Sequence, residues 1–280
     1  MVLNTFSAGF ITRSRVVDTP KLKKIKTECM QTLLGMYKKA NAGHIGASLS
    51  SLDILVYLFF GFMKEQDKFV LSKGHAAAAL YTVLAKAGRI SREQLETFYS
   101  DGTLLAAHPP CTNKIDGITF GTGSLGHGLP LSSGMAFSNR FTGNKFNVYC
   151  VISEGDLNEG STWEAVLFAA QHKLSNLTVI VDNNGLQGFG KSSEVINLEP
   201  LADKFISFGF DTVTAANGND FASLDAAFNR PDSQRPKCII AKTTKGSGIS
   251  FMENKVEWHY LPMTDEQYKK AIDETGPKNA

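Results

Sequence analysis

The chain has 280 residues, of which 42% are hydrophobic and 20% charged, and its formal net charge is +2. This composition is ordinary for a globular protein that is long enough to bury a substantial core. The nearly balanced charge gives no reason to expect nucleic acid or an anionic membrane as a partner. No apolar run approaches the roughly 18 residues of a membrane span, and the N-terminus lacks the apolar core of a signal peptide. We therefore expect a cytoplasmic protein with no membrane span.

Helical spacing of apolar residues alternates with short apolar runs along the chain, which predicts alternating helices and strands. The alternation predicts an α/β fold, a doubly wound and mostly parallel sheet flanked by helices. We expect one domain over residues 1–280, with a flexible tail over 1–19. The predicted helices cover 20–39, 51–60, 76–87, a short segment opened by the capping-box pattern of 91–94, 129–140, 161–173, 200–208, 221–228 and 264–273. The predicted strands are 69–71, 148–152, 177–181, 211–214 and 237–241.

Two polar loops follow consecutive predicted strands, at residues 153–160 and 182–185. Loops at the carboxyl ends of parallel strands lie side by side, and ligands bind there. Glu154 offers a carboxylate, Asn184 an amide oxygen and Leu186 a backbone carbonyl, and Mg²⁺ prefers such oxygen ligands. The pattern predicts a metal-diphosphate site.

Two further features of the first loop fit a phosphate. Gly155 has no side chain to keep a phosphate away from the backbone. The capping-box pattern of Ser161–Glu164 predicts a helix N-terminus just beyond the loop, which favours a nearby anion. The glycine-rich loop 242–248 carries two lysines and is a second candidate for phosphate binding.

Five of the six histidines lie in predicted loops, beside glycine, proline or tryptophan. Imidazole serves proton transfer and oxyanion binding near pH 7, so this clustering in loops favours catalysis. His172 lies inside a predicted helix and is interpreted as structural. The five loop histidines are His44, His75, His108, His127 and His259.

Seven stretches of the chain resemble one family. They are AGHIGASLS, LSKGHAAAALYTVLAKAG, AHPP, GTGSLGHGLP, SEGDLNEGSTWEA, VDNNGL and KTTKGSGISFMEN followed by EWH, in order from residue 42 to 259. They resemble the N-terminal, diphosphate-binding half of transketolase, and most closely the small subunit of two-chain transketolases. The resemblance implies the thiamine diphosphate-binding fold of the PP type, with thiamine diphosphate and Mg²⁺ or Ca²⁺ as cofactors.

The resemblance also implies a metal site. The family's signature is Gly-Asp-Gly followed, roughly 25–30 residues later, by Asn-Asn. A gap-free match places Glu154 on the metal-binding aspartate and Asn184 on the metal-binding asparagine, with the Leu186 carbonyl as third ligand. An alternative alignment uses Asp156 as the ligand, at the cost of a two-residue deletion.

Cofactor and substrate contacts follow from the same resemblance. His127 stands where glutamine is usual in the family. The implied catalytic residues, which handle substrate hydroxyls and protons, are His44, His108 and His259. The implied cofactor-binding residues are His75, Gly123, Ser124, Leu125, Gly155, Asp156, Asn184, Lys245 and His259.

The family's cofactor is activated by a glutamate in a second, pyrimidine-binding domain, for which 280 residues leave no room. The resemblance therefore implies a partner, the C-terminal transketolase subunit with the pyrimidine-binding and C-terminal domains, in a heterodimer or heterotetramer. The expected reaction transfers a two-carbon ketol unit from a ketose phosphate to an aldose. Alternatives are transfer to a carrier protein or unusual sugar, the α subunit of a 2-oxo acid dehydrogenase, and a non-catalytic paralogue.

Overall fold

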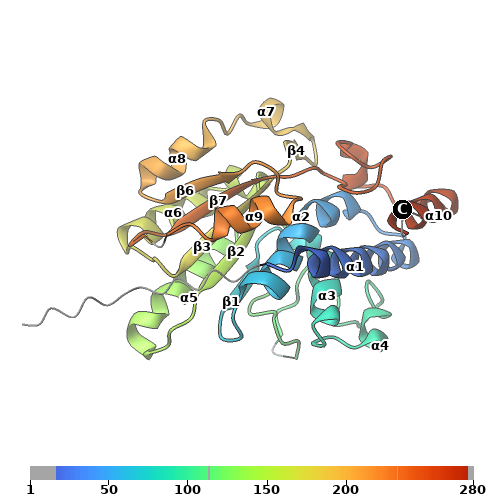
Figure 1. The fold of residues 1–280 in the computed structure, drawn as a ribbon, viewed down its shortest axis with the longest axis horizontal. Helices are drawn as coiled ribbons and strands as arrows, with labels where there is room; N and C mark the ends of the chain where they lie inside the picture. The colour runs from blue at the N-terminus through green and yellow to red at the C-terminus, as the bar shows by residue number, and fades with distance from the viewer. Residues whose placement is uncertain (1–16, 113, 232, 277–280) are drawn as a thin grey trace, which may run out of the picture.

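Five parallel strands form the sheet at the centre of the molecule, in the order β1-β2-β3-β7-β6. The computed structural model describes residues 17–112, 114–231 and 233–276, so most of the predicted tail lies outside the described residues. Every neighbouring pair of strands in this sheet is parallel, which confirms the predicted sheet (Figure 1). The strands are β1 (Lys68–Leu71), β2 (Val148–Ser153), β3 (Leu177–Asn183), β6 (Asp211–Ala215) and β7 (Lys237–Lys242).

The sheet separates two apolar clusters, because alternate residues of a strand point to opposite faces. Tyr149 and Val151 of β2 belong to one cluster, and Val148, Cys150 and Ile152 belong to the other. Both faces of β2 are therefore buried, as expected of a parallel sheet covered by helices on each side.

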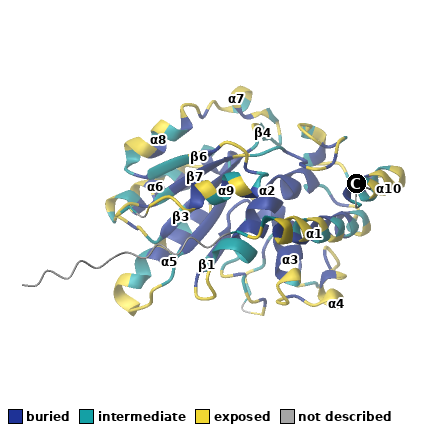
Figure 2. Ribbon diagram, viewed as in Figure 1, coloured by how far each residue is buried: buried dark blue, intermediate teal, exposed yellow. Residues whose placement is uncertain are grey.

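Helices cover each face. The longer helices that contribute to the cluster of Tyr149 are α1 (Thr19–Ala40), α2 (Ile45–Tyr57), α3 (Ala77–Lys86), α9 (Phe221–Phe228) and α10 (Asp265–Thr275). Those that contribute to the cluster of Cys150 are α5 (Gly128–Thr142), α6 (Gly160–Gln171) and α8 (Leu201–Phe208). In Figure 2, β3 of the sheet and α2 are dark blue, whereas α1 and α8 carry many exposed residues. Short elements complete the chain: α4 (Arg92–Leu95), α7 (Ser192–Val195) and a hairpin of β4 (Leu186–Gln187) and β5 (Gly190–Lys191).

Helix α2 differs from its prediction. It begins at Ile45 and not at residue 51, and it continues into a π-helical turn over Leu58–Phe62. Gly46 lies inside the helix, where a Cβ would come within 3.2 Å of Trp258 and 3.3 Å of Lys245, a tertiary packing that local sequence does not reveal. In the described part of the chain, Ile45–Phe62 is also the one helix long and apolar enough to cross a membrane, with 78% of that window buried in the fold. The expectation that no such run exists was therefore wrong.

The two predicted capping boxes had different outcomes. At α4, the Ser91 side chain accepts from Gln94 N–H and the Gln94 side chain accepts from Ser91 N–H, which confirms the prediction. At α6 the predicted helix N-terminus is present, but the capping box does not form. The helix begins at Gly160, and the Ser161 hydroxyl donates to the Gly126 carbonyl at 2.7 Å. Ser161 thus ties the glycine-rich loop to α6 and does not cap the helix.

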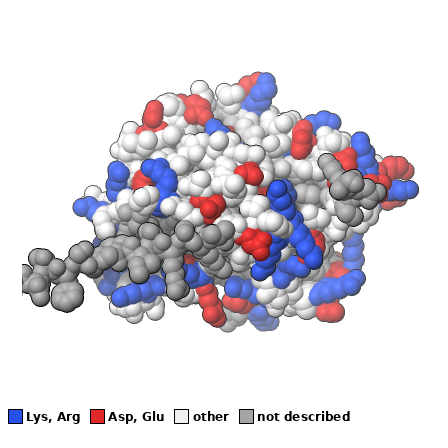
Figure 3. All heavy atoms as spheres, in the orientation of Figure 1, with Lys and Arg blue, Asp and Glu red and all other residues white. Residues whose placement is uncertain are grey.

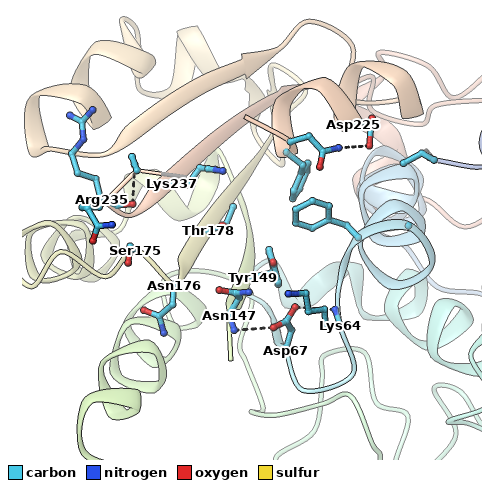
Figure 4. A pocket seen from close by; sticks show the side chains of 17 residues that line it. Lys64, Asp67, Asn147, Tyr149, Ser175, Asn176, Thr178, Asp225, Arg235 and Lys237 are labelled. Atoms are coloured by element: carbon cyan, nitrogen blue, oxygen red, sulfur yellow. Dashed lines mark hydrogen bonds between the residues drawn. The ribbon is translucent and has the colours of Figure 1, made fainter. Parts of the chain in front are cut away.

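A cavity of about 970 Å³ lies at the amino ends of the strands (Figure 4). Asp67, Asn147 and Asn176, which line it, directly precede β1, β2 and β3, and Asp67 accepts from Asn147 N–H at 3.0 Å. Because the strands are parallel, this cavity is at the opposite edge from the predicted site.

Acidic and basic side chains are intermixed on the face in Figure 3, in keeping with the small net charge.

Candidate cofactor site at the carboxyl edge of the sheet

The loops after β2 and β3 meet at the carboxyl edge, as predicted. Ser153 is paired with Asp182 in the parallel register, so the two loops leave the sheet at the same level. Glu154, which is 5% exposed, accepts a hydrogen bond on Oε2 from the Gly185 N–H at 2.7 Å. Burial raises the pKa of the Glu154 carboxyl, and the Gly185 N–H acts in the opposite direction. The carboxylate of one loop is thus held against the backbone of the other.

Asp156 occupies a different position from Glu154. Its Oδ1 accepts from the Ser72 hydroxyl at 2.5 Å and the Gly126 N–H at 2.8 Å. Its Oδ2 accepts from both the N–H and the hydroxyl of Ser153, each at 2.8 Å. With four donors on a fully buried carboxylate, Asp156 joins three loops together and has little capacity left for a metal.

The oxygen atoms offered by the loops after β2 and β3 are chemically suited to a divalent metal. In the described ranges, no cluster of three or more His, Cys, Asp or Glu side chains could hold a metal. The remaining donor set is one carboxylate, the Asn184 amide oxygen and the Leu186 carbonyl, all hard oxygen ligands of the kind Mg²⁺ or Ca²⁺ takes. Asn184 Oδ1 accepts from the Leu186 N–H at 3.0 Å, and a carbonyl oxygen retains a second lone pair for a metal.

Three histidines form a triangle at this edge. The ring centroids of His44, His75 and His259 lie 5.6 Å (44 to 75), 5.0 Å (44 to 259) and 5.5 Å (75 to 259) apart. They come from the start of α2, the segment after β1 and the short helix Val256–His259. The backbone N–H of His44 donates to the His259 carbonyl at 3.0 Å, which joins two of these segments directly. His44 has a φ of 74°, which is uncommon for a residue with a side chain.

The fourth predicted histidine reaches the cluster through the glycine-rich loop. His108 Nε2 lies 2.8 Å from the Ser124 hydroxyl, and His75 Nδ1 lies 3.3 Å from the Ser124 carbonyl. A Cβ on Gly74 would lie 2.3 Å from the Gly123 carbonyl, so only glycine permits this approach of the two loops. Leu125 lies against Gly155, where a Cβ would be 3.0 Å from its side chain.

Burial keeps these imidazoles neutral at pH 7. It is the largest cause that lowers the pKa values of His44, His75 and His108. It lowers the pKa of His259 to about 3, with help from Lys245, His44 and Lys73. Lys245 Nζ lies 3.2 Å from His259 Nδ1, and because an ammonium only donates, the neutral His259 carries its proton on Nε2. Burial also lowers the pKa of Lys245 to about 8.

The other two histidines lie elsewhere. His127 directly precedes α5, and its Nδ1 accepts from the Gly123 N–H at 3.3 Å, so it shapes the glycine-rich loop. His172 follows α6 and packs against Phe137 and Phe168, with centroids 4.7 and 4.4 Å away, in keeping with a structural role.

A buried polar network beneath the site was missed from the sequence. Lys73 and Asp182 form an ion pair with side chains 1% and 0% exposed. Ser50 and Thr243 both donate hydroxyl hydrogen bonds to Asp182. These residues lie far apart in the sequence, and no local pattern connects them. The available signal was only that Lys73 and Asp182 each occur at the end of a predicted buried strand.

Fold and site together define a thiamine diphosphate-binding domain of the PP type. The family model of the transketolase thiamine diphosphate-binding domain matches residues 25–279. The chain therefore belongs to the transketolase thiamine diphosphate-binding domain family, and it is of the transketolase type of transferase.

Relatives of two lengths match the chain. One of the subunits of apulose-4-phosphate transketolase from Phocaeicola vulgatus is 37% identical over 94% of this chain and 95% of its own length. The 6-deoxy-6-sulfo-D-fructose transketolase subunit SqwG of a Clostridium species is 35% identical over 86% of this chain and 91% of its own. Human transketolase is 35% identical over 92% of this chain, but the match spans only 43% of that protein.

Solved structures agree. Transketolase from Campylobacter jejuni superposes with a TM-score of 0.83 and 30% identity, over 91% of this chain and 43% of that chain. Transketolase from Leishmania mexicana gives a TM-score of 0.84 and 26% identity, over 91% of this chain and 41% of that one. The chain thus spans less than half the length of these solved transketolases, and its fold is that of their matching portion.

Proposed function

We propose that this chain is the small subunit of a two-chain, thiamine diphosphate-dependent transketolase that is active only with a pyrimidine-domain partner. The observation that supports this proposal best is the length of this chain relative to the proteins that match it. The chain corresponds to nearly the whole of relatives named as subunits and to less than half of human transketolase. The partner would be a C-terminal subunit, in a heterodimer or heterotetramer, and the assembly would be cytoplasmic.

In this proposal the two strand-end loops hold Mg²⁺ or Ca²⁺ and the cofactor's diphosphate. Glu154, Asn184 and the Leu186 carbonyl would bind the metal. The four donors on Asp156 favour Glu154 over Asp156 for this role, although Asp156 would still shape the cofactor loop. The diphosphate and thiamine contacts would come from His75, Gly123, Ser124, Leu125, Gly155, Lys245 and His259.

The chain's own part in the reaction would be proton handling and orientation. When bound, thiamine diphosphate supplies the nucleophilic carbon and the electron sink for cleavage between C2 and C3 of a ketose. His44 and His108 are neutral at pH 7, so each can accept a proton from a substrate hydroxyl or donate its N–H to a substrate oxygen. His259, whose Nδ1 faces Lys245, can donate its Nε2–H to a substrate oxygen. Lys245 would add a cation beside His259.

A modified ketose is a second candidate for the donor. Two relatives that match over most of their length are named for apulose-4-phosphate and for 6-deoxy-6-sulfo-D-fructose, both unusual sugars. We propose a common ketose phosphate as the first candidate for the donor and a modified ketose as the second. Activity of the assembled enzyme on common and on modified ketoses would separate the two candidates.

Reconstitution tests the proposal. The chain mixed with its partner, thiamine diphosphate and Mg²⁺ should cleave a ketose phosphate, while either chain alone should not. His75→Ala and Asn184→Ala should abolish this activity. His172→Ala, at a histidine placed outside the site, is the matched control and should leave the activity intact. Full activity of the isolated chain would refute the proposed division between two subunits.

A further inference from the structure

The buried ion pair of Lys73 and Asp182 lies beneath the candidate site and bridges two strands. Lys73 follows β1 and Asp182 belongs to β3, so the pair crosses the carboxyl end of β2, which lies between them. Neither side chain reaches solvent, since they are 1% and 0% exposed. Buried charges are costly unless they are paired and hydrogen-bonded. The pair is therefore expected to have a full set of partners.

Each member has such partners. Lys73 Nζ donates to the Ala47 carbonyl at 3.0 Å and lies 3.4 Å from the Ser50 hydroxyl. Asp182 Oδ2 accepts from Ser50 at 2.6 Å, and Oδ1 accepts from the Thr243 hydroxyl. Four segments meet in this network: the first turns of α2, the segment after β1, the end of β3 and the loop after β7.

These four segments also carry the candidate site. Lys73 precedes His75 by two residues, and Thr243 precedes Lys245 by two. Ala47 follows His44 by three residues in the first turn of α2. Asn184 follows Asp182 by two, and its Nδ2 lies 3.4 Å from the Ser50 hydroxyl. A displacement of the ion pair would therefore move four site residues at once.

The pair also sets the charge that Lys245 experiences. Burial is the largest cause that lowers the pKa of Lys245, and Lys73 lowers it further, while Asp182 and Glu154 raise it. His259, the remaining titratable group in contact with Lys245, is 3.2 Å away and neutral at pH 7. Lys73 and Asp182 thus act on Lys245 in opposite directions.

We propose that Lys73 and Asp182 are positioning residues of this site, which hold its four segments together and balance the charge beneath Lys245. That these segments serve catalysis rests on the proposed function. The placement and the charge balance, however, can be tested without cofactor, metal, substrate or partner. A failure here would therefore be distinct from a failure of reconstitution.

The test is the titration of Lys245 in the full chain, followed by NMR of ¹³C-labelled lysine, with assignment from Lys245→Arg. Lys73→Met should raise the titration midpoint of Lys245 by about one pH unit, because a nearby cation is lost and an anion is left. Asp182→Asn should lower it by a similar amount. Lys26→Met is the matched control. It breaks a different ion pair, between Lys26 of α1 and Asp53 of α2 at 2.8 Å with Asp53 1% exposed, and should leave the midpoint unchanged.

Shifts of opposite sign from the two variants, with no shift in the control, are the expected result. If one variant fails to fold, the sign of the other still decides. If both fail, Lys73→Met combined with Asp182→Asn should regain the fold, because no unpaired charge is then buried. An unchanged midpoint in a folded single variant would overturn the proposal. Where neither single variant folds, a double variant that also fails to fold would overturn it.

Discussion

The Glu154 carboxylate and the Gly185 N–H are joined by a hydrogen bond of 2.7 Å that crosses from the loop after β2 to the loop after β3. The resemblance to transketolases aligns Glu154 with an aspartate of the family, and this contact shows what the longer glutamate side chain reaches. That side chain reaches the neighbouring loop and is held beside Asn184 and Leu186. The carboxylate is thereby held against the loop that carries Asn184 and Leu186, the other proposed metal ligands.

Loss of charge at Glu154 should weaken the response to metal. Glu154→Gln keeps the length of the side chain and an oxygen for Gly185 N–H, so the chain should still fold. We expect at least about a tenfold loss of Mg²⁺ affinity in the presence of thiamine diphosphate, measured as the metal-dependent rise in melting temperature. The exposed Glu159→Gln is the control and should behave as the unaltered chain does. An Mg²⁺ affinity in Glu154→Gln equal to that of the unaltered chain would exclude Glu154 as the ligand.

Asp156 should instead be needed for stability, with or without metal. Asp156→Asn leaves one acceptor oxygen for four donors, and its amide N–H₂ faces other donors. Unfolding in urea should show a loss of about 2–4 kcal/mol, equal in the presence and absence of Mg²⁺. A loss that appears only with Mg²⁺ present would mean that Asp156 binds the metal.

The histidine cluster should destabilise the chain in mild acid. The pKa of His259 is about 3 in the folded chain, against the ordinary value of 6.5, so between these values the unfolded chain binds more protons. Stability therefore rises with pH across this window and is lost as pH falls below about 6.5. The raised pKa values of Glu154 and Asp156 act in the opposite sense at lower pH.

A variant separates these contributions. His259→Gln removes one titrating group, so its free energy of unfolding should fall less steeply from pH 7 to pH 5 than that of the unaltered chain. Urea unfolding at several pH values measures the difference. Parallel curves for the two proteins would show that His259 is not held neutral by the fold.

A side chain at Gly188 in the β4–β5 hairpin should press on His259. A Cβ there would lie 2.6 Å from Tyr260 Oη and 3.2 Å from His259 Nε2. The Tyr260 ring is 54% exposed and can move aside, so Gly188→Ala should cost less than about 1 kcal/mol in urea unfolding but should shift the ¹⁵N signals of the His259 ring. Gly134→Ala, in α5 with open space around it, is the control and should stabilise by about 0.5–1 kcal/mol without moving those signals. Unchanged His259 signals in Gly188→Ala would show that the hairpin does not pack on His259.

Local pattern predicted most of the fold because most elements are decided locally. The strands β2, β3 and β7 are apolar on both faces and stand out as short runs, and their observed bounds extend the predicted ones by one or two residues. The start of α2 was missed because a glycine often ends a helix. The close packing of Gly46 against Trp258 and Lys245 is a tertiary feature that the local sequence does not show.

The candidate site, like the fold, was predictable from the sequence only in part. The loops of Glu154 and Asn184 could be placed together because parallel strands end at one edge. The resemblance supplied candidate roles for the histidines, but the triangle of His44, His75 and His259 depends on how distant segments pack. The pairing of Lys73 with Asp182, 109 residues apart, leaves no periodic trace in the sequence.

The central claim is that the loops after β2 and β3 form the metal-diphosphate half of a thiamine diphosphate site. The most direct test is a thermal shift of the chain, alone and assembled with its pyrimidine-domain partner. Thiamine diphosphate with Mg²⁺ at about ten times Kd should raise the melting temperature by about 3 °C, while thiamine with Mg²⁺, which lacks the diphosphate, should not. An equal rise with thiamine, or no rise in either form of the protein, would contradict the claim.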